Sequence, residues 1–164
     1  MNIFRTIESI IDWVGEHVAL LNFVLVILIC VDVALRYVFS FSKNWILELE
    51  WHLFAILFLL GAAYALKHDK HVRVDVFYQK MNERQQATIN FVGTLIFLLP
   101  WCYIVLKTAS SFALNSWYMG EGSPNPGGLP ARYIIKSVVP LAFILLLLEG
   151  IVLIRQQIKT LMRK

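Results

Sequence analysis

Residues 18–39 read VALLNFVLVILICVDVALRYVF, a run in which charged side chains occur only at Asp32 and Arg36. An α-helix needs about 20 predominantly apolar residues to cross the roughly 30 Å of hydrocarbon in a bilayer. This stretch has that length and composition. It therefore predicts a transmembrane helix and places the chain among integral membrane proteins.

Three further runs of the same kind follow, at residues 45–66, 89–106 and 133–154. The third should extend to residue 118, because no Pro or Gly interrupts the sequence after Lys107 until Gly120. The chain is 59% apolar, against about 45–50% for soluble domains. No segment is left that could bury a soluble core of its own. We therefore expect an all-α integral membrane fold with four transmembrane helices and a single membrane domain over residues 1–164.

The segment before the first span, residues 3–14, carries apolar residues at helical spacing and polar residues on the other face. Two interpretations remain open from the pattern. The segment is either an amphipathic helix lying in the membrane interface or the first turns of the first transmembrane helix.

The charge distribution predicts the topology. The net charge is +4, but the basic residues flank the apolar runs, which argues against nucleic-acid binding and for contact with anionic lipid headgroups. One side of the predicted fold carries Arg36, Lys43, Arg132 and Lys136, and the other carries Arg5, Lys67, Lys70, Arg73, Lys80, Arg84, Arg155, Lys159, Arg163 and Lys164. The positive-inside rule then predicts that both termini are cytoplasmic.

Ionisable residues inside apolar spans are costly and are candidates for function. Asp32 and Arg36 share one helix face at i, i+4 spacing, which favours a structural ion pair over a coupling role or a partner contact. Glu48 falls in the first turns of the second helix, where the helix dipole favours an acid and where Ser42 or Asn44 can cap the helix. Glu149, near the cytoplasmic end of the fourth span, could face a neighbouring polypeptide.

Redox chemistry finds no support in the pattern. A b-type haem needs two imidazoles facing each other at one depth, and His17, His52, His68 and His71 do not meet that condition in the predicted topology. Cys30 and Cys102 lie inside spans, where they cannot serve as loop thiols of a disulfide oxidoreductase. We assign no catalytic residue, metal ligand or cofactor site.

Two connecting segments carry the remaining signals. Residues 120–130, GEGSPNPGGLP, contain three Pro and four Gly and predict an outward-facing loop. On the cytoplasmic side, residues 67–80, KHDKHVRVDVFYQK, alternate apolar and charged residues and could wrap a neighbouring helix. Arg73 and Asp75 are its candidate contacts with a partner.

The order of these features resembles the small permease (Q-type) subunit of tripartite ATP-independent periplasmic (TRAP) transporters. The resemblance is carried by these motifs: Arg36-Tyr37-Val38-Phe39, Asn44-Trp45 with Glu48, residues 61–65 followed by 71–76, Glu121-Gly122-Ser123-Pro124, and Gly127-Gly128-Leu129-Pro130. It implies a non-catalytic scaffold in the bacterial inner membrane, with a large M-type subunit that performs sodium-coupled transport and a periplasmic binding protein that delivers an organic carboxylate. Our candidate partner-interface residues are Glu48, Arg73, Asp75, Glu121, Gly127, Gly128, Pro130 and Glu149.

Two other functions compete with this interpretation. A four-helix membrane redox or sensor subunit predicts haem or quinone in purified material. A self-sufficient small exporter predicts transport by this chain alone.

Overall fold

The computed structural model describes residues 3–70, 78 and 80–162. Its elements are α1 (Ile3–Phe39), α2 (Asn44–Lys67), α4 (Glu83–Gly93), the π-helical segment η1 (Thr94–Leu98), α5 (Leu99–Tyr118) and α6 (Tyr133–Met162). The described residues contain no strand. Four helices are long and apolar enough to cross a membrane: α1, α2, the continuous stretch Glu83–Tyr118, and α6. The predicted all-α class with four membrane-length helices is confirmed.

The helices are longer than the apolar runs that predict them. Residues 3–14 join α1 without a break, so they are its first turns. The 37 residues of α1 make a helix of about 55 Å at about 1.5 Å per residue, so part of it extends beyond the hydrocarbon. The helical stretch that holds the third run continues to Tyr118.

This third stretch contains one irregular turn. It starts with a capping box, in which Asn82 and Gln85 bond each other's backbone N–H groups at 2.9 and 3.1 Å. At its middle, the Leu99 N–H bonds the Thr94 carbonyl five residues back, just before Pro100. Proline has no N–H to donate and its ring crowds the preceding turn, so the wider π-turn allows the helix to pass the proline unbroken.

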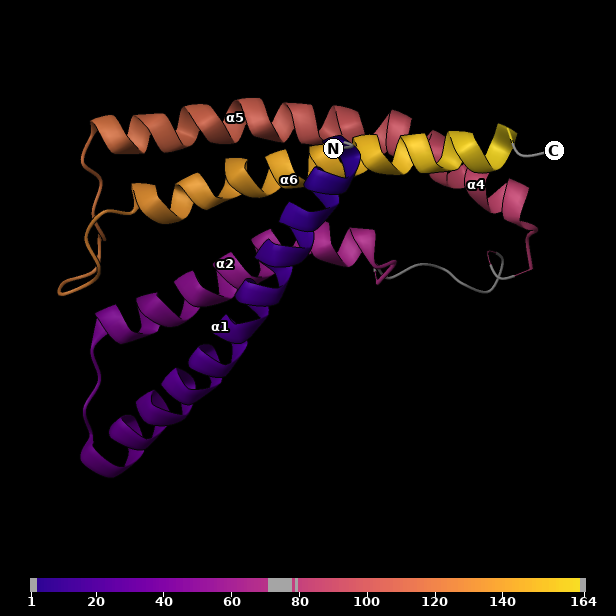
Figure 1. Ribbon diagram of the computed structural model, residues 1–164. Coiled ribbons are helices and arrows are strands. Elements are labelled where there is room, and N and C mark those ends of the chain that lie inside the picture. The colour runs from indigo at the N-terminus through magenta and orange to yellow at the C-terminus, as the bar shows by residue number, and fades with distance from the viewer. Residues whose placement is uncertain (1–2, 71–77, 79, 163–164) are drawn as a thin grey trace.

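The long helices follow one another in the spatial order α1, α2, α6, α5 (Figure 1), with α4 also packed against α6. They therefore form a layer rather than a ring around one common core. Two ends can be distinguished. At the loop end, α1 and α5 end and α2 and α6 begin; at the basic end, α1 and α4 begin and α2 and α6 end. Toward the loop end α1 diverges from α6 (Figure 1).

A closely packed cluster lies in the half of the layer near the basic end. Ile11, Ala63 and Leu145 form a buried cluster that joins α1, α2 and α6. Beside it, Gly15 lies so close to Tyr64 that an added Cβ would overlap the aromatic ring, the kind of close helix approach that small residues permit in membranes. Elsewhere large side chains stay exposed, among them Phe23 at 74% and Phe97 at 73%. Such surfaces suit contact with lipid or with another membrane chain.

Candidate functional site

The connection between α5 and α6, residues 119–132, is an ordered loop at the loop end. Gly120 and Gly127 adopt φ values of +58° and +68°, which glycine takes without the cost that a Cβ imposes. Inside the loop, the Ser123 N–H bonds the Leu129 carbonyl at 3.0 Å and the Arg132 N–H bonds the Glu121 carbonyl at 2.8 Å. These bonds give the Pro- and Gly-rich sequence a defined path.

Glu48 of α2 fixes this loop to the rest of the layer. Its carboxylate is 3% exposed and accepts hydrogen bonds from the Ser123 hydroxyl, from the Asn125 amide at 3.0 Å and from the Leu129 backbone N–H at 2.7 Å. The Arg132 guanidinium lies 3.6 Å away. Hydrogen bonds to an ionised carboxylate are about twice as strong as neutral ones, so one side chain holds several points of the loop. We call Glu48 with residues 119–132 the anchored loop.

Further contacts hold the two edges of the anchored loop. The Asn44 amide donates to the Pro126 carbonyl at 2.8 Å, and the Arg132 guanidinium lies 5.7 Å from the centroid of the Trp51 ring. Lys136, in the first turn of α6, pairs with Glu121. The hydrogen bond from Lys136 lowers the pKa of Glu121 below its ordinary value. The loop is therefore attached to both α2 and α6.

Gly128 marks the tightest point of this arrangement. A Cβ at this position would overlap the Ser123 side chain and lie 2.8 Å from a Glu48 carboxylate oxygen. The φ of this glycine is not in the left-handed region, so space rather than backbone conformation requires the glycine. The loop can approach Glu48 only because this side chain is absent.

The sequence-based expectation that Ser42 or Asn44 caps α2 is wrong. The N-cap position is Lys43, without a side-chain cap bond, and Asn44 bonds the loop instead of capping the helix. His52, one turn further along α2, contacts the backbone carbonyl of Glu48, and the Glu48 carboxylate is left to the loop.

The structure brings together five of the candidate interface residues: Glu48, Glu121, Gly127, Gly128 and Pro130. Asp32 is 1% exposed and contacts Arg36 one turn on, within α1. Glu149 is also 1% exposed, so helices of this chain enclose its carboxylate, and neither oxygen has a hydrogen-bond partner among the described residues. Arg73 and Asp75 lie outside the described residues.

Sequence reasoning missed three residues of the anchored loop, Ser123, Asn125 and Arg132. The sequence did contain a pattern that could have indicated them. Polar side chains lie inside a turn-rich loop, and an acid lies at the start of an apolar helix elsewhere in the chain. The pairing between them depends on how α2 lies against the α5–α6 connection.

Four membrane-length helices with a loop fixed across two of them define a multi-pass membrane protein. Residues 25–160 match the family described as tripartite ATP-independent periplasmic transporters, DctQ component. The chain belongs to this family. The resemblance inferred from the sequence motifs is confirmed.

A similar protein from Haemophilus influenzae is provisionally named a TRAP transporter small permease protein. It is 32% identical over 104 residues, which cover 63% of this chain. The match spans 64% of the length of that protein.

Proposed function

We propose that this chain is a non-catalytic small permease subunit that anchors the large M-type subunit of a sodium-coupled, ATP-independent transporter. In this proposal it also helps to dock a periplasmic binding protein that delivers an organic carboxylate. The observation that carries the docking role is the anchored loop. A surface that is already ordered loses less conformational freedom on binding than a mobile one.

Continuous helices support a scaffold role over a transport pathway. Substrate and ion sites of secondary transporters are typically built from helices broken near the middle of the membrane. Here the third stretch stays helical through Pro100 and α6 stays helical through Pro140. The arrangement of the helices in one layer also leaves broad apolar surfaces on which a larger membrane subunit could pack.

The direction of insertion follows from the same proposal. With both termini in the cytoplasm, the basic end faces inward and the anchored loop faces the periplasm, where a solute-binding protein would meet it. Labelling of single cysteines introduced at Gly122 and at Thr160 with a membrane-impermeant reagent tests this orientation. Labelling of the position 160 variant alone from the outside would contradict it.

The function is tested by reconstitution. The chain is co-expressed with the large membrane subunit and assayed in vesicles for sodium-dependent uptake of organic carboxylates, with and without the binding protein. We expect uptake only when all three proteins are present. Uptake by this chain alone, or haem or quinone in the purified complex, would contradict the proposal.

The docking role has its own test in a pair of loop glycines. Gly128→Ala should reduce binding-protein-dependent uptake, because the new methyl group forces the loop away from Glu48. Gly122→Ala is the matched control, since a Cβ there meets no atom within 4 Å. Co-purification with the large subunit should survive in both variants. Equal uptake by the two variants would argue against a docking role for the loop.

The cytoplasmic segment is proposed to contact the large subunit. Replacing Arg73 and Asp75 together should weaken co-purification of the two membrane chains. Unchanged recovery of the pair would count against this contact.

A further inference from the structure

A pocket of about 230 Å³ opens at the basic end, between the first turns of α1 and the last turns of α6. Three basic side chains line it, Arg5 from α1 and Arg155 and Lys159 from α6, together with the single acid Glu8. Arg5 and Lys159 are exposed, and Arg155 is half-buried. The pocket thus combines cations from two helices that meet only through folding.

The cations of this pocket have no anionic partner in the part of the chain that the structure describes. The ion pairs in that part of the chain involve other residues. Glu8, the one acid in the lining, accepts a hydrogen bond from the Gln156 amide at 3.0 Å. Three cations therefore face one occupied carboxylate, which leaves an excess of positive charge.

Arg155 is also held in position. Its guanidinium carbon lies 3.9 Å from the centroid of the Phe4 ring, a cation–π contact that fixes the plane of the group. A positioned guanidinium offers paired N–H donors that match the oxygens of a phosphate. The first turn of α1 adds the partial positive charge of a helix N-terminus.

The residues around the pocket indicate which kind of phosphate-bearing molecule fits it best. Both helices are membrane-length. The apolar residues Ile3, Ile158 and Met162 belong to the same helix ends as the lining residues and are exposed at 68%, 40% and 77%, so these ends carry an apolar rim. An occupant with an anionic head and apolar tails satisfies both the cations and this rim. A free phosphate ion satisfies only the cations.

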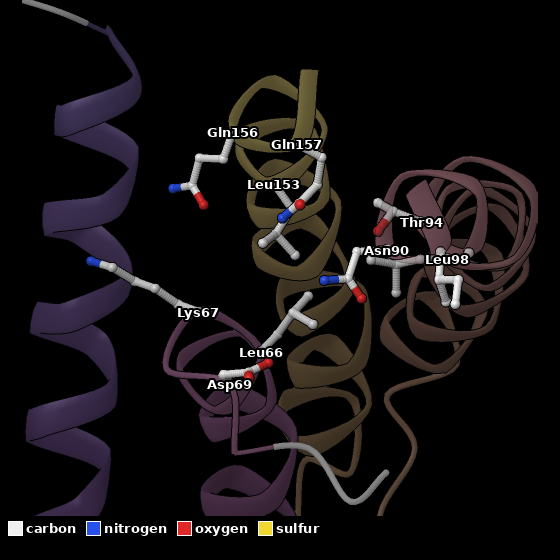
Figure 2. A pocket seen from close by; sticks show the side chains of 11 residues that line it. Leu66, Lys67, Asp69, Asn90, Thr94, Leu98, Leu153, Gln156 and Gln157 are labelled. Carbon is white, nitrogen blue, oxygen red and sulfur yellow. The ribbon is translucent and has the colours of Figure 1, made fainter. Parts of the chain in front are cut away.

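We propose that this pocket binds the phosphate of an anionic phospholipid headgroup at the end of α1 and α6. A larger pocket of about 500 Å³ at the same end, between α2, α4 and α6, is lined by the neutral polar side chains of Asn90, Thr94 and Gln157 and by the acid Asp69. Lys67 borders it but directs its ammonium group toward α1 (Figure 2), where it pairs with Asp12. That pocket lacks the cations that a phosphate requires.

Native mass spectrometry of the full chain in complex with its large subunit tests the proposal. The probes are phosphatidylglycerol and phosphatidylcholine with identical acyl chains. The triple variant Arg5→Gln, Arg155→Gln, Lys159→Gln should bind phosphatidylglycerol about tenfold more weakly, since each basic residue near a membrane surface contributes measurably to anionic lipid binding. The matched control Lys43→Gln, Arg84→Gln, Lys107→Gln removes the same charge at exposed positions outside the pocket and outside the segment proposed to contact the large subunit, and it should bind like the wild type.

Three further results decide the matter. An equal loss in the control variant, or equal binding of the two lipids by the wild type, would overturn the proposal. Displacement of phosphatidylglycerol by equimolar inorganic phosphate would show that the occupant is a soluble anion, which also overturns it. If the triple variant fails to assemble, Arg155→Lys and Arg155→Gln are compared, and only the lysine variant should keep most of the phosphatidylglycerol binding.

Discussion

The two ends of this helical layer are held together in different ways. At the loop end, the 3% exposed Glu48 receives hydrogen bonds from several points of one loop. At the basic end, the Asp12 side chain is 37% exposed and bridges Lys67, the last residue of α2, and His68 directly after it. Exposed ion pairs contribute little to stability, whereas enclosed, multiply bonded carboxylates are costly to remove. The comparison shows that the number of charged residues at one end of the layer does not determine how strongly the helices are attached to each other there.

The largest effect is expected from Glu48→Ala. This change leaves the Asn125 amide, the Leu129 N–H and the Arg132 guanidinium without their shared acceptor, so the loop should detach from α2. Limited proteolysis should then cut within residues 119–132 roughly tenfold faster, the order expected when several charge-assisted hydrogen bonds are lost together. Glu50→Gln, two residues further along α2, is the control. Protection of the loop in the alanine variant would contradict the anchoring role.

A smaller but still clear effect is expected where α1 crosses α2. Gly15→Ala should destabilise the chain by about 1–3 kcal/mol, the usual cost of forcing extra atoms into a packed contact, because the new methyl group meets the Tyr64 ring. Gly61→Ala is the matched control, since nothing lies within 4 Å of a Cβ there. Thermal unfolding in detergent measures the difference, and similar melting of the two variants would refute the close contact.

Asp12→Asn should have a weaker effect than either of these. It removes the partner of Lys67 and His68, but partly exposed pairs are worth about 0.2–1 kcal/mol. Glu16→Gln, one turn further on the exposed surface of α1, serves as the comparison. A loss as large as that of Gly15→Ala would mean that the basic end depends on its ion pairs more than its exposure allows.

The smallest effect is expected from pH. The pKa of Glu121 lies below its ordinary value because Lys136 donates a hydrogen bond to it. A lowered pKa in the folded state stabilises the protein above the unfolded-state pKa, and that stabilisation is lost as the pH falls through the folded-state value. The wild type should therefore lose stability relative to Glu121→Gln only below about pH 4.5, the ordinary value. Thermal unfolding measures the difference in stability between the wild type and Glu121→Gln. A stability difference that shrinks as the pH is raised from 5 to 7 would contradict this prediction.

Periodicity and composition predict the helices well, because apolar runs of about 20 residues have few alternatives to a membrane helix. The ends of the helices were less predictable. The flanking polar residues of α4 and of the last turns of α6 continue the helix without adding hydropathy. The π-turn before Pro100 was also not foreseen, since it depends on backbone geometry rather than on apolar pattern.

The candidate site, like the fold, could be predicted from the sequence only in part. The turn-rich composition of residues 120–130 predicts a loop, and the motifs pointed to Glu48 as well, but no local pattern joins the two. Their contact spans about 80 positions of sequence, and it exists only because α2 and α6 are neighbours in the layer. Glu149 illustrates the same limit, since a position in the chain does not reveal which helices enclose a side chain.

The serial order of the helices gives the Glu48 contact a further consequence. The main packing partner of α5 is α6, and α2 has no substantial contact with α5. In such an arrangement the outer helices could separate independently of each other. Because the loop that follows α5 is hydrogen-bonded to α2, opening of α5 must disturb α2 as well. One carboxylate thereby couples the unfolding of α5 to that of α2.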